Sequence, residues 1–212
     1  MTAILEAKTA QYLDGILPRR DPVLREMERY ARKHHVPIVG AACSRVIYQL
    51  AKMIRARRVF EMGSAIGYST LWLARAVGPK GVVYYSDGDP ANAERARTYL
   101  RRAAVLRRVR IQVGDALELL RSTEGRFDVI FNDVHKIQYP EVFRLAVPRL
   151  RPGGLFITDN VLWSGWVARP ASKIDAETQA IRDFNRMIYR SPKLFTSIIP
   201  LRDGLAVCTK QP

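Results

Sequence analysis

Residues 129–163 read VIFNDVHKIQYPEVFRLAVPRLRPGGLFITDNVLW. Two apolar runs in this stretch, 129–131 and 155–158, are each followed within two residues by an acid, Asp133 after the first and Asp159 after the second. An amphipathic segment and a Pro-Gly-Gly turn separate the runs, which predicts a strand, a helix and a second strand parallel to the first. We therefore expect both acids at the carboxyl ends of neighbouring strands, where open α/β sheets bind ligands.

These acids predict a cation site. Asp133, Asp159 and Asn160 offer two carboxylates and an amide oxygen, a hard donor set that suits Mg²⁺ or Ca²⁺. Lys136 follows the first acid by three residues, so it is close enough to act beside the metal. The alternatives are a solvated loop lysine at 136 and a turn capped by the Asp159-Asn160 pair. The pattern favours an active site at this edge.

The rest of the chain alternates in the same way. Five strands are each followed by a helix, and two closing strands read as an antiparallel hairpin. The expected strands span 58–62, 82–86, 109–113, 127–132, 155–158, 195–200 and 204–209. The helices between them span 69–77, 90–104, 116–122, 139–147 and 175–190. This predicts a Rossmann-like, doubly wound α/β sheet of seven strands, mostly parallel with an antiparallel C-terminal hairpin.

Helical patterns open the chain, at about 3–17, 21–34 and 41–55. Asp21 and Pro22 have the residue types of an N-cap and a first helical position. The sequence shows no repeat and no linker. We expect one domain over 1–212, in which a helical region, 1–56, precedes the core, 57–212.

The first strand runs into a glycine loop, EMGSAIGYS at 61–69. Gly63 and Gly67 allow a tight turn and close approach of a ligand to a helix N-terminus. Their spacing does not fit the G-x-G-x-x-G of dinucleotide sites, and no Walker pattern for a triphosphate is present. A plain strand-to-helix turn is the alternative.

Two further acids lie at the same predicted edge. Asp87, 20 residues after Gly67, ends the second strand, where an acid can bind both hydroxyls of a ribose. Asp115, in Gly-Asp-Ala, follows the third strand and could accept from an adenine amino group. Asp89, directly before Pro90, suits a helix N-cap better than Asp87 does. Together with the glycine loop, these acids indicate a nucleoside site.

The basic composition of the chain indicates a possible polyanionic partner. Of 212 residues, 35 are Lys or Arg, and the formal net charge is +15. Many arginines precede predicted strands and so lie opposite the ligand edge, where solvated surface is the preferred interpretation. The better candidates for gripping a large anion are Arg19, Arg20, Arg25, Arg29, Arg32, Lys33, Arg169 and Lys173. Two isolated cysteines, no apolar run of membrane length and no signal-peptide core favour a cytoplasmic protein.

Several motifs combine into a specific pattern. They are E-x-G-x-x-x-G-x-S at 61–69, the acid ending the second strand, G-D-A at 114–116, F-x-D-x-x-K-x-x-Y at 131–139 and D-N-V-L-W at 159–163. From about residue 36 to the C-terminus, the chain resembles the metal-dependent O-methyltransferases. These are class I S-adenosylmethionine (SAM) enzymes that include the catechol and caffeoyl-CoA methyltransferases.

The resemblance implies roles for residues of this chain. Val39, Glu61, Gly63, Ser64, Gly67, Ser69, Asp87, Asp115 and Asp133 would hold SAM. Asp133, Asp159 and Asn160 would bind Mg²⁺ or another divalent cation, and Lys136 would be the general base. It also implies a homodimer to which the N-terminal helices contribute.

A narrower resemblance concerns the substrate. Residues 34–38 (HHVPI), 63–69 and 198–206 (IIPLRDGLA) resemble the bacterial tRNA 5-hydroxyuridine methyltransferases. We expect 5-hydroxyuridine in tRNA as the favoured substrate, with a small catechol-like or phenolic metabolite as the alternative. A nicotinamide dehydrogenase and a non-catalytic RNA-binding module are disfavoured by the glycine spacing and the complete acid–lysine set.

The chain departs from the family pattern at a few positions. Asn132 replaces an apolar strand residue, Val134-His135 replaces a pair of small and acidic residues, and Gly88 replaces a larger residue. Arg202 stands where the tail usually has glycine. We expect these departures to leave the proposed ligands untouched, and His135 and Arg202 to affect the selection of substrate.

Overall fold

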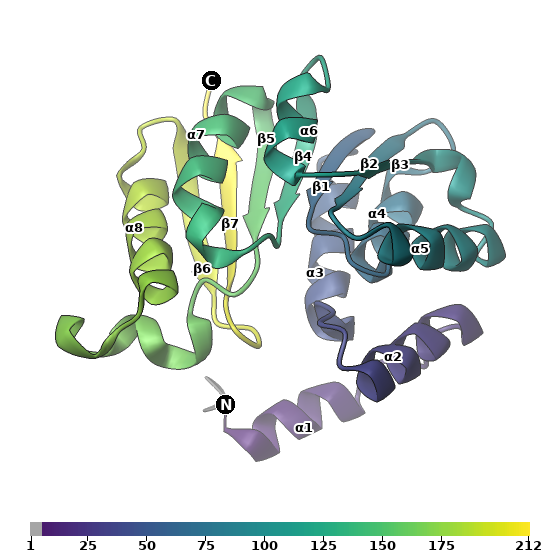
Figure 1. Cartoon of the computed structure of the whole chain (residues 1–212), viewed down its shortest axis with the longest axis horizontal. Helices are drawn as coiled ribbons and strands as arrows, with labels where there is room; N and C mark the ends of the chain where they lie inside the picture. Colours follow the sequence, from purple (N-terminus) through teal and green to yellow (C-terminus); the bar gives the residue numbers. More distant parts are fainter. Residues whose placement is uncertain (1–5) are drawn as a thin grey trace.

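The computed structural model describes residues 6–212. Its centre is a seven-stranded sheet in the order β3-β2-β1-β4-β5-β7-β6 (Figure 1). The strands are β1 (Arg58–Met62), β2 (Val82–Asp87), β3 (Val109–Val113), β4 (Phe127–Asn132), β5 (Leu150–Thr158), β6 (Leu194–Ile199) and β7 (Leu205–Lys210). Strands β1 to β5 are parallel, and β7 runs antiparallel to both β5 and β6. The predicted fold class is confirmed.

Strand order reverses at β1, because β2 and β3 lie on one side of it and β4 and β5 on the other. Such a reversal opens a crevice beyond the carboxyl ends of the strands. The glycine loop leaves β1 at that end, and Asp133 and Asp159 follow β4 and β5 there. The topology therefore brings all the predicted site segments to one edge.

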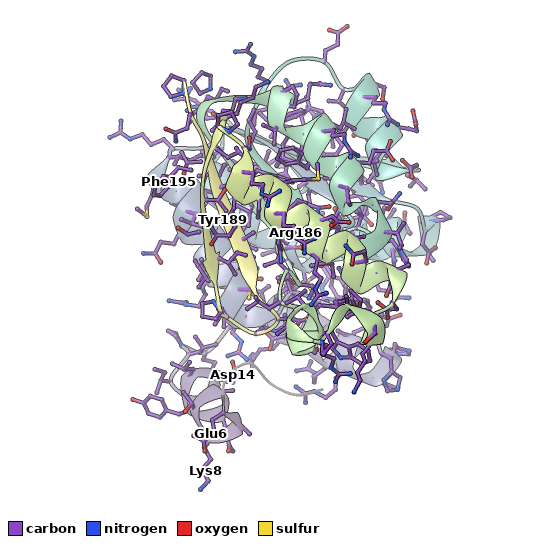
Figure 2. The ribbon with its side chains drawn as sticks, turned by 90° about the vertical axis from the view of Figure 1, so that its left-hand side faces the viewer. Glu6, Lys8, Asp14, Arg186, Tyr189 and Phe195 are labelled. Atoms are coloured by element: carbon purple, nitrogen blue, oxygen red, sulfur yellow. The ribbon has the colours of Figure 1, made fainter. Side chains whose placement is uncertain are left out.

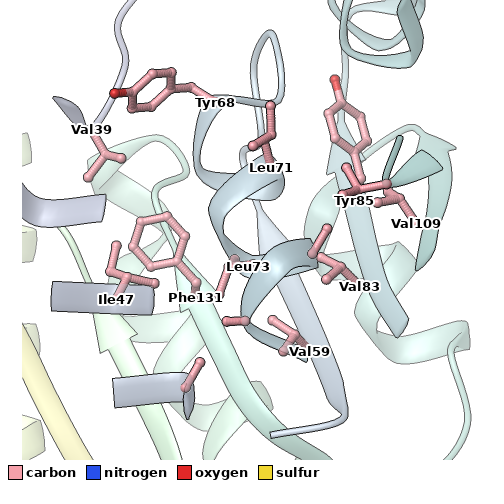
Figure 3. Packing of buried hydrophobic residues seen from close by; sticks show 14 of the residues in the cluster. Val39, Ile47, Val59, Tyr68, Leu71, Leu73, Val83, Tyr85, Val109 and Phe131 are labelled. Carbon is pink, nitrogen blue, oxygen red and sulfur yellow. The ribbon is translucent and has the colours of Figure 1, made fainter. Parts of the chain in front are cut away.

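Helices cover both faces of the sheet. They are α1 (Ala7–Gly15), α2 (Pro22–His34), α3 (Gly40–Met53), α4 (Tyr68–Val77), α5 (Pro90–Arg102), α6 (Ala116–Ser122), α7 (Tyr139–Arg149) and α8 (Ala176–Arg190). One buried cluster packs helices α2, α3, α4 and α5 against the sheet, and includes Ile47, Leu73 and Phe131 (Figure 3). The other joins α6, α7 and α8 to the opposite face. Successive apolar side chains of the central strands alternate between these two cores, as Val129, Ile130 and Phe131 of β4 do.

The N-terminal helices α1 and α2 differ in how closely they pack on the rest of the molecule. Asp21 caps α2, since its Oδ1 accepts from Val23 N at 3.0 Å and from Leu24 N at 3.1 Å, and Pro22 begins the helix as predicted. Helix α1 buries none of its residues and extends away from the body of the molecule (Figure 2). The predicted helix at 3–17 begins outside the described residues and is shorter than expected at its end.

Strand β5 starts five residues earlier than predicted. The prediction began it at Leu155, after the Pro-Gly-Gly turn, but pairing with β4 already begins at Phe127 and Leu150. The register shifts between Phe127 and Val129, so the turn residues are accommodated as an irregularity inside the strand. Helix α7 also continues past its predicted end, with Pro148 in its last turn.

Two arginines near the amino ends of the strands, where solvated surface was the preferred interpretation, also make structural contacts. The Arg58 guanidinium donates to Glu124 O and lies 4.8 Å from the centre of the Tyr84 ring. Arg108 donates to Ala74 O at 3.2 Å. Guanidinium groups can satisfy carbonyls at loop and helix ends while their stems pack on apolar surface. Within residues 6–212, no helix is long and apolar enough to cross a membrane.

Candidate active site

The glycine loop between β1 and α4 is fixed to the end of β2. Gly63 N and Ser64 N both donate to Ser86 O, at 3.1 and 3.0 Å. Gly67 occupies the N-cap of α4 with φ 83°, so the first-turn N–H groups of α4 face the loop. Since these groups form a ready anion-binding end, the loop is a suitable cradle for a charged cofactor.

Gly63 brings this loop against the end of β4. A Cβ on Gly63 would lie 2.5 Å from Asp133 O and 2.8 Å from Asp133 C, and its φ is +79°. Asp133 N in turn donates to Met62 O at 2.9 Å. Only glycine fits here without displacing the backbone of the first acid. The cradle and the acid pair are therefore adjacent.

Asp87 and Asp115 both accept hydrogen bonds from backbone N–H groups. Asp87 Oδ2 accepts from Ala65 N at 2.8 Å, and Oδ1 accepts from Asp89 N at 2.9 Å. It thus ties the glycine loop to the end of β2. Asp115 caps α6 by accepting from Leu117 N at 2.8 Å. Asp89 caps α5, as predicted.

Glu61 is fully buried beneath the loop. Its Oε2 accepts from the Thr70 hydroxyl, and Oε1 has no hydrogen-bond partner in the described structure. Burial raises the pKa of Glu61 to about 7, and hydrogen bonds from Ser69 and Thr70 oppose that rise. An ionised carboxylate is costly in such surroundings unless a ligand group reaches it. Glu61 thus keeps one carboxylate oxygen without a partner beneath the glycine loop.

Glu61 should make stability depend on pH. The folded protein holds the proton up to about pH 7, whereas an unfolded glutamate loses it near its ordinary pKa of 4.5. The folded state therefore binds more protons in this window, and stability should fall as pH rises from 4.5 to 7 and then level off. Between pH 5 and pH 8 the loss attributable to Glu61 should be about 2–3 kcal/mol.

The matched variant is Glu61→Gln, which keeps the shape and can still accept from Thr70. We expect it to remove that part of the slope, as measured by urea unfolding of both proteins at pH 5, 6, 7 and 8. Parallel slopes for the two proteins would contradict the assignment.

The two strand-end acids lie close together, as predicted. Lys136 Nζ donates to Asp133 Oδ1 at 2.9 Å, and the lysine side chain is only 11% exposed. Asp159 is buried, and its Oδ1 has no hydrogen-bond partner among the described residues. Burial and then the neighbouring charge of Asp133 raise the pKa of Asp159. Burial also raises the pKa of Asp133, against the charge of Lys136. A buried carboxylate beside a half-buried one is a favourable place for a cation.

Asn160 follows directly and adopts a left-handed backbone with φ 59°, which asparagine tolerates better than most residues. Within residues 6–212 no cluster of three His, Cys, Asp or Glu side chains could hold a metal. The donor set is thus limited to Asp133, Asp159 and the Asn160 amide. The orphaned Asp159 oxygen and the all-oxygen chemistry of the three side chains fit a hard divalent cation.

Comparison with known proteins identifies the family. The model of the O-methyltransferase family matches residues 18–211. The chain belongs to this family. The prediction of a SAM-dependent O-methyltransferase is confirmed.

The matched relatives cover nearly the whole chain. A catechol O-methyltransferase of Mycobacterium tuberculosis is 35% identical over 89% of this chain and 86% of its own length. A catechol O-methyltransferase of Niastella koreensis is 30% identical over 92% and 93%. The crystal structure of the O-methyltransferase TomG from Streptomyces achromogenes, in complex with SAM, has a TM-score of 0.87 at 30% identity over 97% of this chain and 96% of that chain.

Tyr139 and Trp163, which have no role assigned above, border this O-methyltransferase site. Tyr139 is fully buried at the start of α7, and its hydroxyl donates to Asp159 O at 2.8 Å. Lys136 Nζ lies 5.1 Å from the centre of its ring and 5.7 Å from that of Trp163. These rings limit the volume in which the lysine can move. Tyr139 belongs to the F-x-D-x-x-K-x-x-Y pattern, so the sequence signalled its presence but not its bond.

Arg202 corrects a prediction. We expected the departures from the family pattern to leave the proposed ligands untouched, but Arg202 Nη1 donates to Val39 O and, at 3.2 Å, to Ile38 O. Val39 is buried at the N-cap of α3. The two segments are 163 residues apart in sequence and meet because the β6–β7 hairpin points to the same edge as the acids.

Proposed function

We propose that this O-methyltransferase is divalent-cation dependent and methylates a hydroxyl that lies next to a second oxygen. The observation that carries the proposal is the Asp133–Asp159 pair, in which Asp159 is buried and has an unpartnered oxygen, and Asp133 is half-buried with Lys136 Nζ 2.9 Å away. Asp133, Asp159 and Asn160 would hold Mg²⁺. When bound there, Mg²⁺ supplies positive charge that lowers the pKa of a hydroxyl and orients two vicinal oxygens.

Side chains of the protein itself carry out proton transfer and positioning. Lys136 accepts the hydroxyl proton, and Asp133 orients the lysine through their hydrogen bond. The Tyr139 and Trp163 rings keep the lysine over the acid pair. Methyl transfer needs an oxygen in line with the S–CH₃ bond, so positioning by these groups supplies much of the acceleration.

The residues proposed to hold SAM surround the cradle. Gly63, Ser64, Gly67 and Ser69 come from the loop and the start of α4, which would receive the charged methionine end near Val39. Asp87 and Asp115 lie farther along the same edge, at the ends of β2 and β3, for the ribose and the adenine. Glu61 and Asp133 border the cradle from below and beside it. The donor would thus lie directly beside Lys136.

The favoured substrate class is a small phenol with two vicinal oxygens. Both relatives described above are catechol O-methyltransferases, and further matches include caffeoyl-CoA O-methyltransferases at 27% identity over 92% of this chain. A catechol presents one oxygen for methylation and a second for the cation. The compact, ring-lined surroundings of Lys136 suit a flat aromatic acceptor.

5-Hydroxyuridine in tRNA is the second candidate, because it offers the same two oxygens through its 5-hydroxyl and 4-carbonyl groups. A specific observation favours it. Among the described residues, no carboxylate lies within ion-pair distance of several N-terminal and loop cations, namely Arg19, Arg29, Arg32, Lys33 and Lys173. By contrast, Arg20 is paired with Glu28 at 2.9 Å. Unpaired cations near the site could contact phosphates.

The deciding experiment incubates the protein with methyl-labelled SAM and either 3,4-dihydroxybenzoate or tRNA carrying unmethylated 5-hydroxyuridine. Each reaction is run with Mg²⁺, with EDTA, and with EDTA followed by excess Mg²⁺. We expect label on the catechol that EDTA abolishes and Mg²⁺ restores. Label on 5-methoxyuridine alone would establish the second candidate, and transfer that is insensitive to EDTA would refute cation dependence.

A homodimer and a cytoplasmic location remain proposals. Tyr12 on α1 and Ile16 directly after it are exposed. Tyr189 and Phe195 are exposed at the α8–β6 edge (Figure 2). Exposed aromatic residues are typical of subunit interfaces. Light scattering should give twice the mass of one chain, and a mass of one chain would refute the dimer. Cys43 and Cys208 are buried free thiols, which suits a reducing compartment.

A further inference from the structure

Arg202 occupies the tip of the β6–β7 hairpin, at the edge of the sheet that carries the acids. Its backbone is left-handed, with φ 52°, a conformation that glycine adopts without cost. The guanidinium lies directly over Gly40, where an added Cβ would be 3.2 Å from Arg202 Nη1. An arginine here extends its guanidinium to the start of α3, at a position where the backbone itself favours glycine.

The hairpin tip is anchored to the loop that follows the second acid. Leu162 N donates to Asp203 O at 2.9 Å, and Val161 N donates to Gly204 O at 3.1 Å. Asp203 Oδ1 also accepts from Ser164 N. On its other side, Arg202 Nη1 is held by the carbonyls of Ile38 and Val39. The guanidinium is therefore fixed between the acid loop and the start of α3.

Arg202 lies beside the loop that follows the second acid but has no acidic partner. The hairpin tip that carries it is bonded to Val161, Leu162 and Ser164, which directly follow Asp159 and Asn160. No carboxylate of residues 6–212 lies within ion-pair distance of it. Arg202 is exposed as a whole, and within residues 6–212 only its Nη1 has hydrogen-bond partners. Nε and Nη2 of the planar fork thus have no protein partner.

We propose that Arg202 binds a carboxylate of the methyl acceptor, so that the preferred substrate is a vicinal dihydroxy aromatic acid rather than a neutral catechol. The inference rests on the proposed function of this site. The geometry favours it because a guanidinium with two free donors matches a carboxylate in shape and charge. Lys136 and Arg202 both lie at the edge of the sheet that carries the acids, and an anionic acceptor balances these two cationic side chains.

The test compares 3,4-dihydroxybenzoate with 3,4-dihydroxybenzyl alcohol, which differ mainly in that carboxylate. For wild type and Arg202→Gly, kcat/KM is measured for both acceptors with SAM and Mg²⁺. The wild type should prefer the acid by about tenfold or more, mostly in KM, and the variant should lose that preference. Glycine suits the left-handed backbone, so the variant should fold. Arg202→Lys, which keeps charge without the fork, should retain an intermediate preference.

Two further measurements complete the design. Calorimetry gives the affinity of each acceptor for the protein with S-adenosylhomocysteine, independently of turnover. Arg144→Gln removes an equal charge from the α7–α8 groove and should leave the ratio of the two acceptors unchanged. Equal use of both acceptors by the wild type, or an equal loss for both in Arg202→Gly, would overturn the proposal and leave the proposed function standing.

Three further outcomes distinguish a failure of this inference from a failure of the proposed function. Binding of the acid that depends on Arg202, without methylation of either acceptor, would support the inference and refute the proposed substrate class. Absence of both binding and transfer would overturn both. A loss in Arg202→Gly confined to methylation of tRNA would assign the guanidinium to a phosphate and refute the carboxylate.

Discussion

Replacing Lys136 with methionine is expected to lower kcat by about 10²–10⁴-fold, the usual contribution of a positioned general base. Methionine retains the length and apolar stem of lysine, so it can still pack between the Tyr139 and Trp163 rings. What it removes is the amine 2.9 Å from Asp133 Oδ1. The acceptor hydroxyl would then lack a group to take its proton. The measurement is single-turnover methyl transfer to 3,4-dihydroxybenzoate at saturating SAM and Mg²⁺.

The affinity for the cofactor product distinguishes a lysine that acts as a base from one with a purely structural role. If Lys136 acts on the proton, the affinity for S-adenosylhomocysteine should change by less than about threefold while the chemical step slows. Lys80→Met, in the exposed turn between α4 and β2, removes an equal charge from the opposite edge of the sheet and should retain wild-type kcat. A Lys136→Met protein with more than a tenth of wild-type kcat would show that another group takes the proton.

The acids of this site could be found from sequence because the information is local. Asp133 and Asp159 each follow an apolar run directly, and the parallel arrangement of two such runs fixes where both side chains lie. The same holds for the glycine loop and for Asp21, whose roles depend on residues two or three positions away. Short-range patterns therefore predicted the edge of the sheet and the segments that meet there.

The contacts that shape the pocket were not predictable in this way. Arg202 meets Val39 across 163 positions, and that meeting depends on the hairpin pairing with β5 as well as on side-chain rotamers. Tyr139 bonds Asp159 across 20 positions, through a helix whose orientation is set by packing in the second core. Burial of Glu61 likewise follows from the helices above it. Sequence patterns contain residue types, whereas these contacts arise from tertiary geometry.

Replacing Gly63 with alanine is expected to destabilise the fold by about 2–5 kcal/mol and to lower activity by more than about a hundredfold. The added Cβ would lie 2.5 Å from Asp133 O, and a left-handed φ of +79° is itself unfavourable for alanine. Because the colliding atom is backbone, relief requires the loop and the end of β4 to separate. That movement displaces the cradle from Asp133 and Lys136. Urea unfolding and single-turnover transfer measure the two effects.

The Gly125→Ala control separates the effect of the steric collision from the cost of the left-handed backbone conformation. Gly125 has a similar φ of +82°, but a Cβ there would meet only the Arg58 guanidinium at 3.6 Å, an ordinary contact. It should therefore lose about 1–2 kcal/mol and keep full activity, since it lies between α6 and β4, away from the acids. If the two variants were equally stable and equally active, close contact between the loop and Asp133 would have no role in positioning the donor. If Gly63→Ala alone lost activity while binding S-adenosylhomocysteine normally, the contact would act on alignment with the acceptor rather than on cofactor affinity.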